Sequence, residues 1–287
     1  MSVNDQLVER SLPSWREGPA KRSLISFLRE VTRGRDELPV DQRVAAFDLD
    51  GTLVCEKPRT MLAEFLLDQG GAANADSVGR AAAAGGHDVL RELGVVFAGR
   101  MVIDYDEAAR GFLARALHPR FGCSYPSLAY QPMLELMALL GALQFSVFVC
   151  TDSSRDFVRV MAEPIFGLRR EKIIGSEVRI DSIRGALVRT AEPVPFDDGP
   201  GKTVHLWDRT GTQPLLAAGN AAGDIAMLSA ARYGLVVRHD DELREYAYDD
   251  QEILSAAAME QWTVVSMRHD FIKVWEAAPP GVRPDLR

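Results

Sequence analysis

Cysteine is scarce in this sequence, which limits the kinds of site that it can build. The 287 residues include three cysteines, Cys55, Cys123 and Cys150, and none belongs to a CxxC pair. Because three thiols cannot all pair with one another, we expect reduced cysteines that pack as small side chains in a cytosolic protein. The five histidines show no metal-ligand spacing, so the sequence predicts no zinc site.

An excess of positive charge and long apolar runs are also missing. The net charge is -8, so neither nucleic acid nor an anionic membrane surface is an expected partner. No segment is apolar over the length of a membrane span, and residues 1–18 lack the apolar stretch of a secretory signal. We therefore expect a cytoplasmic protein, and its oligomeric state is left without a prediction.

Short apolar runs alternate with segments of helical periodicity, which is typical of an α/β fold with a parallel sheet. The predicted strands are Val44–Asp48, Phe145–Cys150, Leu215–Ala218, Leu235–Arg238 and Thr263–Ser266. The predicted helices are Pro19–Val31, Pro132–Leu143, Ser154–Ala162 and Asp224–Ala231, and Ser176–Arg189 is predicted to form an antiparallel hairpin.

The long segment between the first two predicted strands is expected to form a separate unit. Residues 55–127 are rich in Ala, Gly, Leu and Glu and carry few strand signals. A crossover between parallel strands needs far fewer residues. We therefore predict a mostly helical cap at 55–127, inserted into a core that is formed by residues 1–54 and 128–287.

Two acidic residues follow the first predicted strand. In FDLDGTL, an apolar run delivers Asp48 to the carboxyl end of the strand, Asp50 comes two residues later, and Gly51 permits a tight turn. Ligands bind at this edge of open α/β sheets. Two carboxylates this close repel each other, and a hard cation such as Mg²⁺ relieves that repulsion while accepting phosphate oxygens. An Asp-Gly turn that only ends the strand is the alternative interpretation.

The pattern DxDGT after an apolar strand resembles motif one of the haloacid dehalogenase superfamily of phosphohydrolases. FVCTDSS at 148–154 is similar to motif two, so the resemblance implies that Thr151 and the following helix N-terminus bind phosphate. GPGKT at 199–203 supplies Lys202 as the motif-three cation. A P-loop is disfavoured, because that pattern needs glycine at the position of Phe196.

LLAAGNAAGDIAML at 215–228 resembles motif four. The resemblance implies that Mg²⁺ is held by the side chains of Asp48 and Asp224 and by the backbone carbonyl of Asp50. Asn220 stands where the common pattern has an acid, and its amide is expected to support Lys202 or a metal-bound water. Segments along the core resemble the phosphoserine-phosphatase-like branch, which implies a Rossmann-like parallel sheet with helices on both faces.

The substrate side of the site is less specific in sequence. The branch usually has glycines after the motif-two threonine, whereas this chain has Asp152. Its carboxylate would disfavour an anion unless it points away, and the alternative is that Asp152 binds substrate through a hydrogen bond to a cationic or hydroxylated leaving group. Lys57 and Arg59 follow motif one and are the predicted substrate-binding cations, with Glu56 and Arg100 as weaker candidates. The acidic segment His239–Glu242 is predicted to cap the helix that follows it.

The resemblance implies a Mg²⁺-dependent phosphatase that acts on a small phosphorylated metabolite. Asp48 is the expected nucleophile, which forms an aspartyl-phosphate, and Asp50 is the expected general acid and base. Lys202 and Thr151 are expected to hold the phosphoryl oxygens. A phosphotransferase that passes the phosphoryl group to another acceptor, and a non-catalytic binding protein that kept the fold, remain open alternatives.

Overall fold

The structure is a computed structural model that describes residues 11–33, 37–71, 74–194 and 196–282. Its centre is a six-stranded sheet in the order β3-β2-β1-β6-β7-β8, and every neighbouring pair runs parallel. The strands are β1 (Val44–Phe47), β2 (Ser146–Ser154), β3 (Ile173–Ser176), β6 (Leu216–Gly219), β7 (Tyr233–Arg238) and β8 (Thr263–Ser266). The predicted parallel sheet is thus confirmed, and β3 is an additional edge strand.

Helices cover both faces of the sheet, because its buried strands alternate their side chains between two apolar layers. Ala45 and Phe47 of β1 belong to the larger cluster, and Val44 and Ala46 belong to the smaller one. The first face is covered by α2 (Pro19–Arg33), α7 (Gln131–Ala142) and α8 (Arg155–Phe166), and the second by α9 (Pro200–Thr210), α10 (Ile225–Ala230) and α11 (Gln251–Glu260). The last helix is the short α12 (Met267–Asp270).

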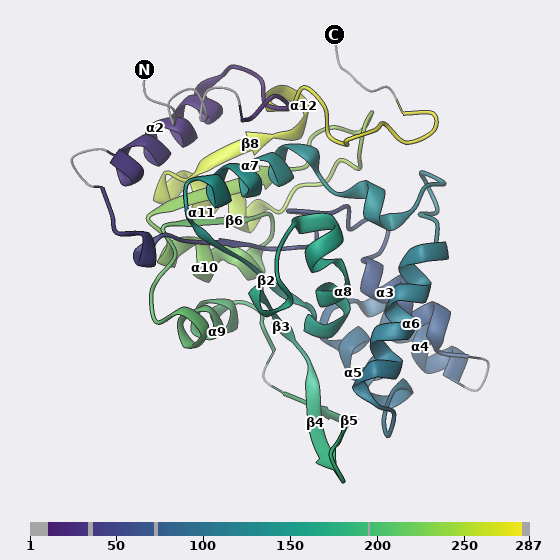
Figure 1. The fold of residues 1–287 in the computed structure, drawn as a ribbon. Helices are drawn as coiled ribbons and strands as arrows, with labels where there is room; N and C mark the ends of the chain where they lie inside the picture. Colours follow the sequence, from purple (N-terminus) through teal and green to yellow (C-terminus); the bar gives the residue numbers. More distant parts are fainter. Residues whose placement is uncertain (1–10, 34–36, 72–73, 195, 283–287) are drawn as a thin grey trace.

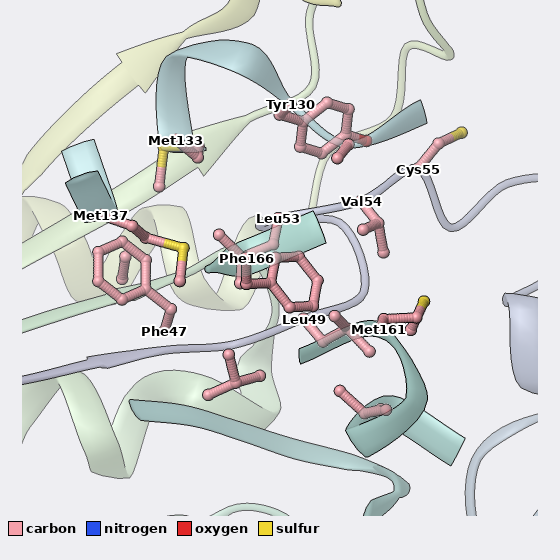
Figure 2. Packing of buried hydrophobic residues seen from close by; sticks show 14 of the residues in the cluster. Phe47, Leu49, Leu53, Val54, Cys55, Tyr130, Met133, Met137, Met161 and Phe166 are labelled. Atoms are coloured by element: carbon pink, nitrogen blue, oxygen red, sulfur yellow. The ribbon is translucent and has the colours of Figure 1, made fainter. Parts of the chain in front are cut away.

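The larger cluster anchors the residues that lead into and out of motif one. Figure 2 shows Phe47 of β1 near Met133 and Met137 of α7, with Leu49 and Leu53 of the following turn in the same apolar layer. All of these side chains are buried. The turn that carries Asp50 therefore packs against a close-packed apolar layer.

The insertion after β1 is helical, as predicted. It contains α3 (Met61–Gln69), α4 (Ala75–Ala84), α5 (Gly86–Val96) and α6 (Val102–Arg115), which group together to one side of the sheet (Figure 1). An aromatic cluster joins this insertion to the core: Phe65 of α3 lies 5.1 Å from Phe157 of α8, measured between ring centroids. The cap boundaries at 55 and 127 remain a prediction.

The predicted hairpin is also present and projects beyond the sheet (Figure 1). Its strands are β4 (Val178–Ile183) and β5 (Ala186–Pro193), which pair antiparallel. Residues that follow α5 hydrogen-bond to β5 through the backbone: Gly99 N donates to Arg189 O, and Arg189 N donates to Arg100 O, both at 2.9 Å. The hairpin is therefore joined to the cap.

Two features of the chain differ from the sequence interpretation. His239–Glu242 does not cap a helix, because α11 begins at Gln251 and the Asp250 side chain accepts hydrogen bonds from the amides of its first turn. Lys202 lies in the first turn of a helix, α9, where no helix was predicted. Within the described residues, no helix is both long and apolar enough to span a membrane.

Candidate active site

Three neighbouring strands bring the predicted motifs to one edge of the sheet. Asp48 directly follows β1, and its amide still donates to Ala218 O of β6 at 2.9 Å. β1 lies between β2, which carries Thr151, and β6, which ends just before Asn220. The chain moves outward from β1 to β3 and then returns to β6 on the other side of β1. This reversal is where open α/β sheets bind ligands.

Lys202 lies between two of the predicted acids. Its Nζ donates to Asp48 Oδ1 and to Asp224 Oδ1, each at 2.6 Å. The lysine is 3% exposed. Burial alone would lower the pKa of Lys202, but Asp224 and Asp48 outweigh it and hold that pKa well above its ordinary value. Lys202 is therefore a fixed cation within the site.

The second oxygen of Asp224 is fixed by backbone amides. Asp224 Oδ2 accepts hydrogen bonds from Asn220 N at 2.9 Å and from Ala221 N at 3.1 Å. Gly219 lets the two segments approach, since a Cβ at that position would lie 2.4 Å from Asp224 Cβ. The glycine that ends β6 is thus required for the position of this carboxylate.

Asn220 also holds the turn of motif one. Gly51 has a φ of +79°, and a Cβ there would lie 2.1 Å from Asn220 Nδ2, so the turn accepts only glycine. Thr52 Oγ1 donates to Asn220 Oδ1 at 3.0 Å. In this structure the Asn220 amide accordingly links motifs one and four, and it makes no hydrogen bond to Lys202.

Asp50 carries a free acceptor inside the site. Its Oδ1 is buried and accepts no hydrogen bond. Burial raises the pKa of Asp50 well above its ordinary value, and the nearby carboxylates of Asp152 and Glu56 raise it further. A carboxyl whose pKa is raised holds its proton more readily than an ordinary aspartate, which suits general acid catalysis.

Thr151 lies at the same edge and is fully buried. Its Oγ1 accepts a hydrogen bond from Ser153 N at 3.0 Å, which turns the chain toward α8. Ser154 then caps that helix, because its Oγ accepts from Phe157 N at 3.3 Å, as the sequence predicted. The motif-two hydroxyl and a helix N-terminus are therefore adjacent.

Comparison with known proteins identifies the family. Residues 45–229, well over half of the chain, match the family described as haloacid dehalogenase-like hydrolase. The chain belongs to the haloacid dehalogenase-like hydrolases. This confirms the superfamily that the four motifs indicated, and the matched range begins at β1 and ends in α10.

Solved structures share this fold at low sequence identity. A functionally unknown protein from Anaerococcus prevotii DSM 20548 is 13% identical with a TM-score of 0.60, and 88% of this chain and 93% of that chain are covered. A protein of unknown function from Bordetella pertussis Tohama I is 14% identical with a TM-score of 0.55, covering 78% and 98%. A phosphoserine phosphatase described as a phospho-aspartyl intermediate analogue has a TM-score of 0.45 at 14% identity, and 80% of this chain and 95% of that chain are covered. No curated protein matches the sequence.

The residue that departs from the usual hydrolase pattern, Asp152, lies under the cap. A Cβ on Gly86, the first residue of α5, would lie 4.0 Å from Asp152 Oδ2. The next residue, His87, stacks on Phe196 with ring centroids 3.7 Å apart, and its Nε2 lies 3.6 Å from Asp198 Oδ2. Burial raises the pKa of Asp152, the Lys202 ammonium lowers it, and the Asp198 carboxylate raises it further. Asp152 is thus near both the reacting residues and the cap.

The predicted substrate-binding cations lie after motif one but have partners of their own. Arg59 Nη2 lies 2.7 Å from Glu64 Oε1 on α3. Lys57 Nζ lies 4.5 Å from the centre of the Tyr248 ring and 3.6 Å from Glu56 Oε1. Both side chains are about two-fifths exposed, at 43% for Arg59 and 39% for Lys57. Their contact with substrate remains a prediction.

The donor set of this hydrolase fits a hard divalent cation. Among the described residues, no three His, Cys, Asp or Glu side chains converge as a metal site by themselves, and the predicted set needs only two carboxylates with a backbone carbonyl. Asp48 and Asp224 share the single Lys202 ammonium at 2.6 Å, so the two carboxylates, when both are ionised, carry more charge than this lysine balances. Oxygen donors with unbalanced charge are what Mg²⁺ binds.

Proposed function

We propose that this hydrolase is a Mg²⁺-dependent phosphomonoesterase that acts on a small phosphorylated metabolite through a phosphorylated Asp48. The observation that carries the proposal is the buried Lys202 ammonium, held 2.6 Å from both Asp48 and Asp224 at the carboxyl edge of the sheet. A fixed cation beside a strand-end aspartate can stabilise the charge that develops on a transferring phosphoryl group.

In the first step, Asp48 attacks phosphorus and the bond from phosphorus to the leaving oxygen breaks. Asp50 gives its proton to that oxygen, so an alcohol departs and an aspartyl-phosphate remains. The raised pKa of Asp50 supports this role, because burial favours the protonated form of the acid.

In the second step, the Asp50 carboxylate takes a proton from water as the water attacks phosphorus. The bond between phosphorus and the Asp48 oxygen breaks, which releases phosphate and restores both acids. Lys202 and the Thr151 hydroxyl orient the phosphoryl oxygens. Asp48, Asp224 and the Asp50 carbonyl would hold Mg²⁺, which would supply positive charge to offset the phosphoryl oxygens.

The test is phosphate release from p-nitrophenyl phosphate and from phosphorylated amino acids, sugars, amino alcohols and nucleotides. Activity should require Mg²⁺, stop with EDTA and be lost in Asp48→Asn, while the circular dichroism of that variant stays native. Asp50→Asn should accumulate phosphoenzyme, which intact-protein mass spectrometry detects as added phosphate. Turnover by Asp48→Asn near the wild-type rate would remove the proposed nucleophile.

Product analysis with a competing alcohol separates hydrolysis from transfer. Formation of a new phosphomonoester in place of inorganic phosphate would identify a phosphotransferase with the same phosphorylated aspartate. No turnover of any substrate in the panel with Mg²⁺ present would instead support a binding protein that kept the fold.

A further inference from the structure

The motif-one turn is held by a buried histidine that follows β7 at the same edge of the sheet. His239, the residue after β7, places its Nε2 2.7 Å from Gly51 O, and its Nδ1 lies 3.0 Å from Glu245 Oε2. His239 is 2% exposed and Glu245 is fully buried. Gly51 directly follows Asp50, so this contact fixes the peptide next to the proposed general acid.

The chemistry of the partners sets the direction of these hydrogen bonds. The Gly51 carbonyl can only accept, so His239 Nε2 carries a proton and donates to it. The other carboxyl oxygen, Glu245 Oε1, lies 3.2 Å from both Tyr130 Oη and Cys55 Sγ, which donate to it. Glu245 is therefore fixed on both oxygens and in turn orients the imidazole.

Packing leaves the imidazole little freedom to rotate. Tyr248 stacks on His239 with ring centroids 4.2 Å apart and planes 17° apart. The backbone also joins the two residues, because Tyr248 N donates to His239 O at 2.9 Å. The segment 239–248 thus forms a rigid support behind motif one.

Asp50 depends on such a support. Its buried Oδ1 has no hydrogen-bond partner, so no polar contact of that oxygen sets its position. The turn is instead held through its backbone, where Gly51 N donates to Val54 O at 2.8 Å and Gly51 O accepts from His239. A rotation of the peptide that follows Gly51 would move the adjacent Asp50.

We propose that His239 is a positioning residue which, oriented by Glu245, donates to Gly51 O and holds Asp50 in the geometry needed for proton transfer. This inference rests on the proposed function for its catalytic consequence. Proton transfer requires heavy atoms within hydrogen-bond reach, and a displacement of about 1 Å can cost on the order of 100-fold in rate.

Two substitutions at position 239 separate positioning from packing. In His239→Gln the side-chain amide nitrogen falls near the place of Nε2 and can still donate to Gly51 O. In His239→Asn the amide nitrogen falls near the place of Nδ1. The side chain can then still donate to Glu245 but no longer to Gly51 O. We expect kcat to fall about 100-fold in His239→Asn with KM within about threefold, and His239→Gln to retain kcat within about fivefold of wild type.

Hydrogen exchange supplies a readout that does not need activity. The amides of residues 51–54 should exchange faster in His239→Asn than in His239→Gln or wild type. If the wild-type protein shows no phosphatase activity, the proposed function fails, and the exchange pattern still tests the contact. Equal kcat and equal exchange in the two variants would overturn the inference.

Glu245→Gln tests the same support if His239→Asn does not fold, as judged by its circular dichroism. This substitution keeps the size of the side chain but weakens the hydrogen bond to His239 Nδ1. We expect a loss of kcat of about tenfold with KM unchanged and faster exchange at residues 51–54. Wild-type values of both quantities in this variant would contradict the proposal.

Discussion

At the scale of single residues, the site depends on the balance between one buried lysine and several acids. Lys202 contacts Asp48 and Asp224, while Asp50 Oδ1 has no hydrogen-bond partner in the part of the chain that the structure describes. Removing one partner of a buried ion pair leaves an uncompensated charge, which is costly in a medium of low polarisability. The residues that we propose to perform the chemistry therefore also determine whether the sheet edge is stable.

Asp152 should weaken the binding of anions, because its carboxyl lies near the reacting residues. We expect Asp152→Asn to lower the inhibition constant for inorganic phosphate by about five- to tenfold, which corresponds to roughly 1 kcal/mol of electrostatic repulsion. Steady-state inhibition by phosphate measures it. Asp88→Asn, an exposed change on α5, is the matched control. An unchanged constant, with a raised KM for amine-bearing substrates only, would instead assign Asp152 to the leaving group.

The pair of His205 and Asp197 supports the segment that leads into α9. His205 Nδ1 lies 2.8 Å from Asp197 Oδ1, and this hydrogen bond raises the pKa of His205 although partial burial opposes it. A raised histidine pKa adds stability that is complete below the unfolded value of about 6.5 and is lost as pH rises through the folded value. Thermal melting should therefore show a larger decrease from pH 6 to 9 in wild type than in His205→Gln. Parallel curves for the two proteins would exclude this linkage.

At the scale of elements, a buried arginine joins the hairpin to α8. Arg189 of β5 is 1% exposed, its Nη2 lies 2.5 Å from Glu177 Oε1, and its Nη1 lies 3.3 Å from Asp156 Oδ2. Its guanidinium also lies over the ring of Tyr105 on α6, 3.8 Å from the centroid. One side chain thus contacts the hairpin, the motif-two helix and the cap.

Arg189→Met should destabilise the protein, because it leaves the buried Glu177 carboxyl without its cation and removes one of three arginines that pair with Asp156. We expect the free energy of unfolding to fall by about 3–5 kcal/mol in urea titrations. Arg179→Met in β4 is the control, since Arg179 is half-exposed and its ion pairs with Asp181 and Glu192 are near the surface. Exposed pairs contribute about 0–1 kcal/mol. Similar losses in both variants would contradict a special role for Arg189.

The sequence predicted the elements whose signals are local. β1, β2, β6, β7 and β8 are apolar runs that end in polar turns, and each was expected. β3 was missed because only two of its residues, Ile173 and Ile174, are apolar, which is too short a run to stand out in the sequence. α9 was missed because GPGKT suggested a loop, although Pro200 at the first helical position is a start signal.

At the scale of the whole molecule, the motif residues could be predicted but their contacts could not. Asp48, Thr151, Lys202 and Asp224 carry recognisable local patterns, and a parallel sheet gathers their strand ends at one edge. Glu245, the partner of His239, lies six residues later in the chain. No local pattern marks this pair, because an acidic residue at that distance from a histidine is common in any sequence. Long-range pairings of this kind depend on tertiary packing alone.

Metal binding should be visible as a change in global stability. A cation that binds the folded state adds RT ln(1 + [L]/Kd), which is about 2.7 kcal/mol at 100-fold excess over Kd. We expect Mg²⁺ to raise the melting temperature of wild type by several degrees and that of Asp224→Asn much less. Na⁺ at matched ionic strength is the control. Equal shifts with both salts, or in both proteins, would count against the site.

The backbone pairing of residues 99–100 with Arg189 links two stretches that lie about ninety positions apart in the chain. Replacing the cap with that of a relative, in order to alter substrate preference, therefore requires the exchange of more than one continuous segment. A chimera that receives foreign residues 55–127 but keeps its own residues 178–193 would lose this backbone pairing. The two stretches therefore have to be transplanted together.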